Sequence, residues 1–106
     1  MSRKNNTDRS GNKFSNLKKM QVWLKATSVP EYDPLIIRKD SCKAWIEWSK
    51  YGITDKNGRG WEIDHIKPVS KRGSDDISNL QALQWQNNRK KSDDYPASNY
   101  CESSAK

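Results

Sequence analysis

The stretch from Trp61 to Asp93 most limits the folds open to this chain, because it places two apolar runs, a loop and a basic segment in one order. In 61–66 apolar and polar residues alternate as far as the histidine, which is the pattern of a half-buried strand. Residues 79–83 predict a brief second strand, and a helix is expected from residue 84 or 85 to about 92. The stretch therefore predicts strand, loop, strand and helix around the only histidine of the chain.

The length of 106 residues predicts one small domain, and the expected strands and helix make its class α+β. Apolar residues are scarce, so the five tryptophans and four tyrosines are expected to supply much of the buried surface. Residues 1–18 predict a flexible basic arm, and residues 96–106 predict a polar tail that frays. The folded domain is expected at 19–95, with its core at 61–93.

Three predictions concern the segment before this core. Residues 20–25 indicate either a short strand or the end of a helix, and residues 34–39 predict a short helix behind an Asp-Pro start. Residues 44–51 fit either a helix or a strand, and we favour the strand. With the Asn57–Gly58 turn signal, this strand is expected to form a hairpin with 61–66.

The cysteines and the apolar runs bear on the cellular compartment. Cys42 and Cys101 form no CxxC pair, so a thiolate-bound zinc is not expected. A disulfide between them stays open, but two reduced thiols in a cytoplasmic protein is the simpler interpretation. No apolar run approaches the roughly 20 residues of a membrane span, and the basic N-terminal residues lack the apolar stretch of a secretory signal. We therefore expect a cytoplasmic protein with no membrane partner.

The net charge of +7 is unevenly distributed. Residues 1–21 contain six basic residues and one acidic residue, whereas 61–106 contain seven of each. Excess positive charge favours a polyanionic partner such as nucleic acid, although a basic tail can also serve solubility alone. We expect the N-terminal part to contact phosphates without sequence preference.

Three polar residues of the central stretch suit phosphodiester hydrolysis. This reaction needs a base for the water proton and a cation that neutralises the phosphoryl group. Asp64 and the side-chain carbonyl of Asn88 offer the oxygen ligands that Mg²⁺ prefers, and the His65 imidazole suits the base. Adjacent strand residues point to opposite faces, so the strand must end or twist at Asp64 and His65 if both are to reach one phosphate.

These residues resemble the motif of the HNH endonuclease family. The resemblance covers, in order, Asp64-His65-Ile66-x-Pro68, Gly73-x-Asp75, Asn79-Leu80-Gln81-x-Leu83 and Asn88-x-x-Lys91. It implies a ββα-metal fold, with two antiparallel strands, a loop and a helix around one divalent cation, here joined to an added N-terminal hairpin or helix region. By position, Asp64 and Asn88 would be the metal ligands and His65 the general base. Asn79 would brace the loop and help to hold the histidine.

Two departures from the family pattern affect the expected metals. The last motif residue is often histidine, whereas Asn88 keeps an oxygen ligand and indicates Mg²⁺ or Mn²⁺. Many members also hold a structural zinc with CxxC pairs, but the corresponding positions here are Gln84 and Asn87, so no structural zinc is expected. We expect aromatic packing to replace that clamp, with Trp45, Trp48, Trp61 and Trp85 as its members.

The sequence thus predicts a metal-dependent HNH endonuclease that hydrolyses DNA with low sequence specificity, as a monomer, as a homodimer or with a partner that lends specificity. The candidate nucleic-acid contacts are six basic side chains of the helix and the loop: Arg89, Lys90, Lys91, Lys67, Lys71 and Arg72. Two alternatives stay open. One is a non-catalytic nucleic-acid-binding accessory protein of the same fold, of a kind that a phage or mobile element carries, and the other is a nuclease that acts on RNA or branched DNA.

Overall fold

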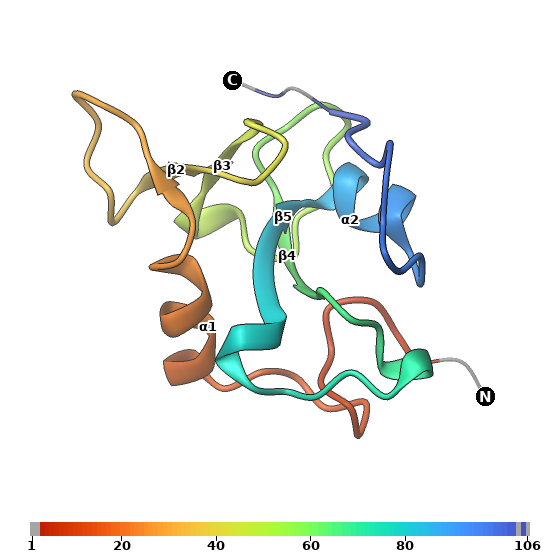
Figure 1. Cartoon of the computed structure of the whole chain (residues 1–106). Helices are drawn as coiled ribbons and strands as arrows, with labels where there is room; N and C mark the ends of the chain where they lie inside the picture. Colours follow the sequence, from red (N-terminus) through yellow and green to blue (C-terminus); the bar gives the residue numbers. More distant parts are fainter. Residues whose placement is uncertain (1–2, 104, 106) are drawn as a thin grey trace.

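The computed structural model describes residues 3–103 and 105, and a two-stranded antiparallel sheet lies at its centre (Figure 1). Its strands are β4 (Trp61–His65) and β5 (Leu80–Gln84), and helix α2 (Trp85–Lys91) follows β5 directly. The α+β class and the predicted order of strand, loop, strand and helix are therefore confirmed.

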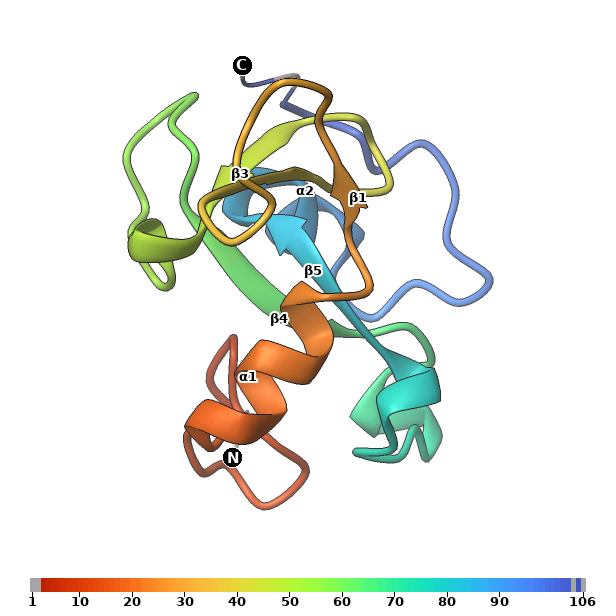
Figure 2. The ribbon, with the colours of Figure 1, turned by 90° about the vertical axis from the view of Figure 1, so that its left-hand side faces the viewer.

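Strand β4 is buried along its whole length, not on one face only. Helices α1 (Asn16–Trp23) and α2 lie on opposite sides of the central sheet, and β5 covers one edge of β4 (Figures 1 and 2). The strand ends at His65, and the chain then leaves the sheet through Pro68 and a short 3-10 turn. The end of β4 therefore carries two polar residues inside the protein.

The predicted hairpin between 44–51 and 61–66 is wrong. Strand β3 (Trp45–Glu47) pairs with β2 (Ile37–Lys39), which in turn pairs with β1 (Thr27–Ser28). A single parallel bridge connects the end of the 44–51 segment to β4. The reason is a 3-10 turn directly after β3, which redirects the chain before a ladder with β4 can form.

Two other local predictions have different outcomes. Residues 20–25 contain the last part of α1, in agreement with the helix alternative. The helix predicted at 34–39 is wrong, because Asp33 closes only one turn before Ile37 begins β2. In that turn the amides of Ile36 and Ile37 both donate to the Asp33 carbonyl at 2.9 Å. No helix in the described part of the chain is long and apolar enough to cross a membrane.

Three tryptophans form the centre of the apolar core. The ring centroid of Trp23 lies 5.1 Å from that of Trp61 and 5.6 Å from that of Trp48, and Trp48 lies 5.8 Å from Trp61. Two of these were predicted as core aromatics, but Trp23 was not. Trp45 and Trp85 are only partly buried and lie outside this cluster. Aromatic packing therefore supports β4 on the side of α1, but the tryptophans that form it differ from the predicted set.

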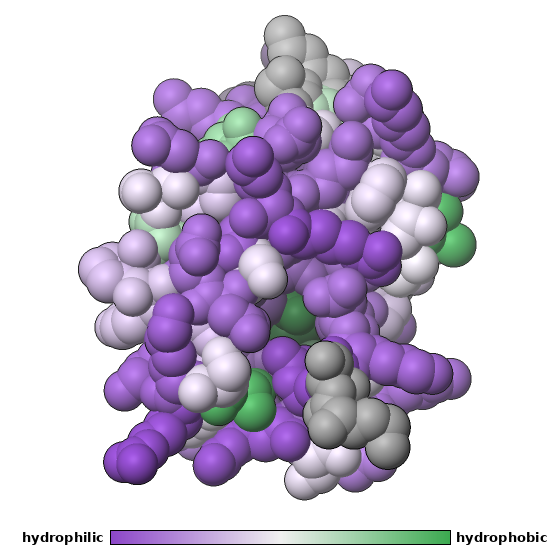
Figure 3. Space-filling view, turned by 90° about the vertical axis from the view of Figure 1, so that its right-hand side faces the viewer, coloured by the Kyte–Doolittle hydropathy of each residue, from purple (hydrophilic) through white to green (hydrophobic). Residues whose placement is uncertain are grey.

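The N-terminal residues lie against β4, which differs from the expected flexible arm. Asn6 Oδ1 accepts hydrogen bonds from the Ile63 amide at 2.7 Å and from the Tyr51 hydroxyl at 2.9 Å. The expected boundary at residue 18 also falls inside α1. The face of the molecule that carries these residues is mostly hydrophilic and is hollowed near its centre (Figure 3).

The C-terminal residues return to the body of the protein, whereas the sequence predicts a fraying tail. Cys42 and Cys101 form a disulfide, so the prediction of two reduced thiols is wrong. The Trp45 amide donates to the Ala105 carbonyl at 2.6 Å. These contacts were not predictable locally, because the two cysteines are separated by 59 positions in the sequence.

Candidate active site

Asp64, His65 and Asn88 line one cavity of about 240 Å³. The first two lie at the end of β4, and the third comes from α2. The strand stops at His65, and this ending allows two consecutive side chains to border the same space. The structure therefore brings together three of the four residues to which the sequence assigns chemistry, and the fourth, Asn79, lies in the adjoining loop.

The Asp64 carboxylate is 5% exposed and is held from two sides. Its Oδ2 accepts from Gln81 Nε2 at 2.9 Å, and its Oδ1 accepts from Lys91 Nζ at 3.2 Å. Burial raises the pKa of Asp64, while the Gln81 hydrogen bond and the Lys91 charge oppose that rise. Asp64 is thus a carboxyl group held in a fixed orientation at the wall of the cavity.

Lys91 is buried, with 2% of its surface exposed. Its ammonium donates to Asp64 and also to the His65 carbonyl, at 3.0 Å. The predicted contact of Lys91 with nucleic acid is wrong, because a buried ammonium group cannot reach a phosphate outside the protein. A lysine on α2 that bonds two consecutive β4 residues instead fixes the helix against the end of the strand.

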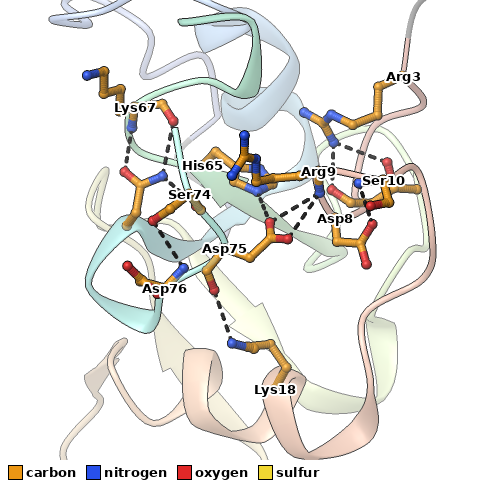
Figure 4. Close-up of polar contacts among 12 residues, drawn as sticks. Arg3, Asp8, Arg9, Ser10, Lys18, His65, Lys67, Ser74, Asp75 and Asp76 are labelled. Carbon is orange, nitrogen blue, oxygen red and sulfur yellow. Dashed lines mark hydrogen bonds and ion pairs between the residues drawn. The ribbon is translucent and has the colours of Figure 1, made fainter. Parts of the chain in front are cut away.

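His65 is held by a carboxylate from the loop that follows β4. Its Nε2 lies 2.7 Å from Asp75 Oδ1, and Figure 4 shows the two side chains facing each other. Asp75 also accepts from the backbone amide of Arg9, at 3.2 Å to Oδ1. When Nε2 donates to Asp75, Nδ1 keeps the lone pair that a general base needs.

The sequence signal for Asp75 was its place in the Gly-x-Asp element, but that element did not reveal a partner for the histidine. Phe14 also contributes to the pocket of His65, with ring centroids 6.0 Å apart. Residues of the N-terminal segment thus support the histidine directly and through Asp75.

Asn79 joins the two ends of the loop between β4 and β5. Its Oδ1 accepts from the Lys67 amide at 2.8 Å, and its Nδ2 donates to the carbonyls of Lys67 and Ser74 at 3.1 and 2.8 Å. The Asn79 carbonyl also accepts from the Ile66 amide at 2.8 Å. This is the geometry that a loop-bracing residue requires.

Asn88 is held by Glu62 of β4. Asn88 Nδ2 donates to Glu62 Oε1 at 2.8 Å, and Arg89 Nη2 donates to Glu62 Oε2 at 2.9 Å. Glu62 is only 2% exposed. The alternating pattern of β4 is typical of a strand with Glu62 on the surface, but helix α2 covers it.

Residues 46–94 match the family model described as HNH endonuclease. This segment belongs to the HNH endonuclease family. No curated protein and no solved structure shows a significant match to the chain. The matched segment contains β4, β5, α2 and the loop that holds Asp75 and Asn79. HNH domains are nucleases as a family, typically use divalent metal ions, and have nucleic acid as their substrate.

The HNH donor set here fits a hard cation with few protein ligands. Asp64 and Asn88 offer oxygen atoms to one cavity. Among the described residues, no three His, Cys, Asp or Glu side chains gather as a metal cluster. Mg²⁺ is commonly bound through one or two protein oxygens, with water and substrate phosphate completing its shell. The two oxygen donors therefore fit a divalent cation of this kind.

A buried polar network occupies the two positions where many HNH domains have cysteines. Gln84 and Asn87 are fully buried, and both donate a hydrogen bond to Asp40 Oδ2. The donors are the backbone amide of Gln84, at 2.9 Å, and the side-chain Nδ2 of Asn87, at 3.0 Å. Asn87 Oδ1 accepts from the amides of Glu102 and Ser103, each at 2.7 Å. Hydrogen bonds and the nearby disulfide thus tie α2 to its surroundings in this HNH domain.

The other predicted nucleic-acid contacts of the HNH domain differ in their availability. Lys67, Lys71 and Arg72 are exposed, although Lys71 Nζ donates to the Asp93 carbonyl at 2.6 Å. Lys90 and Arg89 are both exposed, and the Arg89 guanidinium also pairs with Glu62. One basic residue that the prediction did not include, Arg3, lines the cavity itself.

Proposed function

We propose that this HNH domain is an endonuclease that hydrolyses DNA phosphodiester bonds with one Mg²⁺ or Mn²⁺. The observation that supports this most strongly is the shared cavity of Asp64, His65 and Asn88, where a base and two oxygen ligands border one space. A base and a cation site on one phosphate are the minimum requirement for this hydrolysis.

The side chains divide the work in a defined way. Asp64 and Asn88 hold the cation, which when bound would neutralise the scissile phosphate and the leaving oxygen. His65 Nδ1 takes the proton from the attacking water, and the Asp75 carboxylate stabilises the imidazolium that forms. Asn79 keeps the loop closed, so that Asp75 stays in reach of the histidine.

Contacts to the rest of the substrate come from basic side chains around the cavity. Arg3 is the basic residue that lines the cavity, and we assign it to the phosphate at the cut. Lys67, Arg72 and Lys90 are exposed and would contact flanking phosphates. Phosphate contacts carry no sequence information, so cleavage is expected to have low sequence specificity.

The test is nicking of supercoiled plasmid with Mg²⁺, with Mn²⁺ and with EDTA, beside His65→Ala. We expect nicking in either metal, none in EDTA, and a loss of roughly 10²- to 10⁴-fold in His65→Ala, since this is the usual contribution of a general base. DNA binding by gel shift should be retained in the variant. RNA and branched DNA of equal length identify the preferred substrate.

A non-catalytic role is the alternative, and the Lys91 ammonium at Asp64 is the observation in its favour, because it already offers that carboxylate a cation. Wild-type protein that binds DNA but never nicks it under any divalent cation would establish this alternative and overturn the proposed activity.

A further inference from the structure

Glu62 is a buried acidic residue directly behind the proposed metal ligand Asn88. It lies on β4, two positions before Asp64, and 2% of its surface is exposed. Its Oε1 accepts from Asn88 Nδ2, and its Oε2 accepts from Arg89. Both carboxylate oxygens therefore accept hydrogen bonds from two consecutive residues of α2, with the short bonds from Asn88 to Oε1 and from Arg89 to Oε2.

The contact with Glu62 decides which way the Asn88 amide points. An amide side chain has a donor end and an acceptor end, and either can face a given neighbour. A carboxylate only accepts, so Nδ2 must face Glu62 and Oδ1 must face the other way. In the described part of the chain Asn88 Oδ1 accepts no hydrogen bond, yet no buried side-chain oxygen lacks a partner. Oδ1 thus opens to the cavity that Asn88 lines with Asp64.

We propose that Glu62 is a positioning residue that makes Asn88 a metal ligand by fixing its amide with the oxygen toward the cavity. This rests on the proposed function, because it assumes that Asn88 holds the cation. Glu62 itself does not touch the metal or the substrate. Its role is to exclude the amide orientation that would present an NH₂ group, which has no lone pair for a cation.

Arg89 decides which end of the side chain at position 62 faces Asn88. Its Nη2 donates to Oε2 at 2.9 Å, and its Nε lies 3.4 Å from Oε1. In Glu62→Gln the guanidinium still requires an acceptor at the Oε2 position, so the new NH₂ group takes the Oε1 position and faces Asn88. Asn88 must then turn its oxygen toward Gln and its NH₂ toward the cavity. An isosteric change that leaves the packing intact thereby removes a metal ligand.

A polarity swap should restore the ligand. In Glu62→Gln/Asn88→Asp, the glutamine NH₂ donates to one oxygen of the new aspartate, and its carbonyl still accepts from Arg89. The other aspartate oxygen faces the cavity. The pair keeps the same number of carboxylates as the wild type, so a simple charge effect cannot explain a restored affinity. Asn88→Asp alone sets two carboxylates against each other and is expected to lower stability.

The experiment measures Mn²⁺ binding without DNA, by calorimetry or by electron paramagnetic resonance, so that no catalysis is needed. Glu62→Gln should weaken Mn²⁺ binding about 10- to 100-fold, the usual effect of removing a partner of a metal ligand, and the double variant should return to the wild-type level or above it. Glu47→Gln is the matched control, since Glu47 also pairs with an arginine, Arg59, at 3.4 Å but bonds no side chain that lines the cavity. Its affinity should equal that of the wild type.

The outcomes separate this inference from the proposed function. Glu62→Gln that binds Mn²⁺ within threefold of wild type, or a double variant no better than Glu62→Gln, overturns the role of Glu62 alone. Asp64→Asn that binds as tightly as wild type overturns the metal site and this inference with it. Thermal unfolding in EDTA checks that each variant folds. If Glu62→Gln does not fold, the double variant decides: affinity at the wild-type level supports the role, and a loss of about tenfold or more overturns it.

Discussion

His65 Nε2 lies 2.7 Å from Asp75 Oδ1, and the two residues come from the end of β4 and from the loop that follows it. Asp75 is held in turn by the backbone amide of Arg9, and its own carbonyl accepts from Lys18 Nζ at 3.0 Å. The orientation of the histidine is therefore set by three separate segments of the chain. Asp75 and the N-terminal residues therefore belong to the proposed site as much as the motif residues do.

Replacing Asp75 with Asn should lower the nicking rate roughly 10- to 100-fold, because the carboxylate that stabilises the imidazolium is lost. Mn²⁺ affinity should not change, since Asp75 does not line the cavity with Asp64 and Asn88. Asp76→Asn is the matched control, because Asp76 is exposed and its side chain makes no contact with His65. Single-turnover rates on plasmid DNA measure the effect. Equal rates for the two variants would contradict a role for Asp75.

Replacing Asp64 with Asn should abolish stabilisation of the fold by metal. A ligand at 100 times its dissociation constant stabilises the native state by about 2.7 kcal/mol, provided that it binds only that state. Wild-type protein should therefore unfold at a higher temperature in Mn²⁺ than in EDTA, and Asp64→Asn should show the same melting temperature in both. Thermal unfolding followed by tryptophan fluorescence measures this difference. A variant with the full wild-type shift would place the metal elsewhere.

Replacing Arg3 with Ala should slow cleavage about tenfold by removing a charge-assisted contact to the scissile phosphate. Lys4→Ala removes the same charge one residue away, on an exposed side chain that does not line the cavity of Asp64 and Asn88. Lys4→Ala should lower DNA affinity slightly and leave the rate at saturating DNA unchanged. Rates at saturating DNA, compared with dissociation constants from fluorescence anisotropy, separate the two effects. Equal losses in both variants would mean that only general electrostatic attraction is involved.

Reduction of the Cys42–Cys101 disulfide should destabilise the protein by about 2–4 kcal/mol, because the bond closes a long loop of the unfolded chain. Urea unfolding with and without a reducing agent measures the difference in the free energy of unfolding. Cys42→Ser/Cys101→Ser should have the lower stability in both conditions. If the reducing agent lowers the stability of that variant equally, the effect does not come from the disulfide.

The central ββα unit could be predicted because its signals are local. The alternation in 61–66, the proline after it and the apolar run at Leu80 each act within a few residues, and the motif spacing connects them. The first sheet could not be predicted in the same way. Whether β3 pairs with β2 or with β4 depends on contacts between distant segments, and a strand carries no mark of its partner.

Local sequence patterns also could not predict which charged side chains are buried. Glutamate and lysine usually lie on the protein surface, yet Glu62 and Lys91 are almost fully buried. Their burial is compensated by partners on other elements: Glu62 has Asn88 and Arg89, and Lys91 has Asp64. A charged group is buried only where such a partner exists, and the partner becomes visible only when the strand and the helix are packed together.

The sequence by itself therefore determined the order of the ββα elements and the candidates for the base, the metal ligands and the loop brace, because motif spacing is a property of the chain. The tertiary structure alone decided what holds those side chains. It placed Asp75 on His65 and Glu62 on Asn88, and it brought Arg3 to the cavity. The physical reason is that a side chain is oriented by hydrogen bonds to neighbours in space, and folding brings those neighbours from distant parts of the chain.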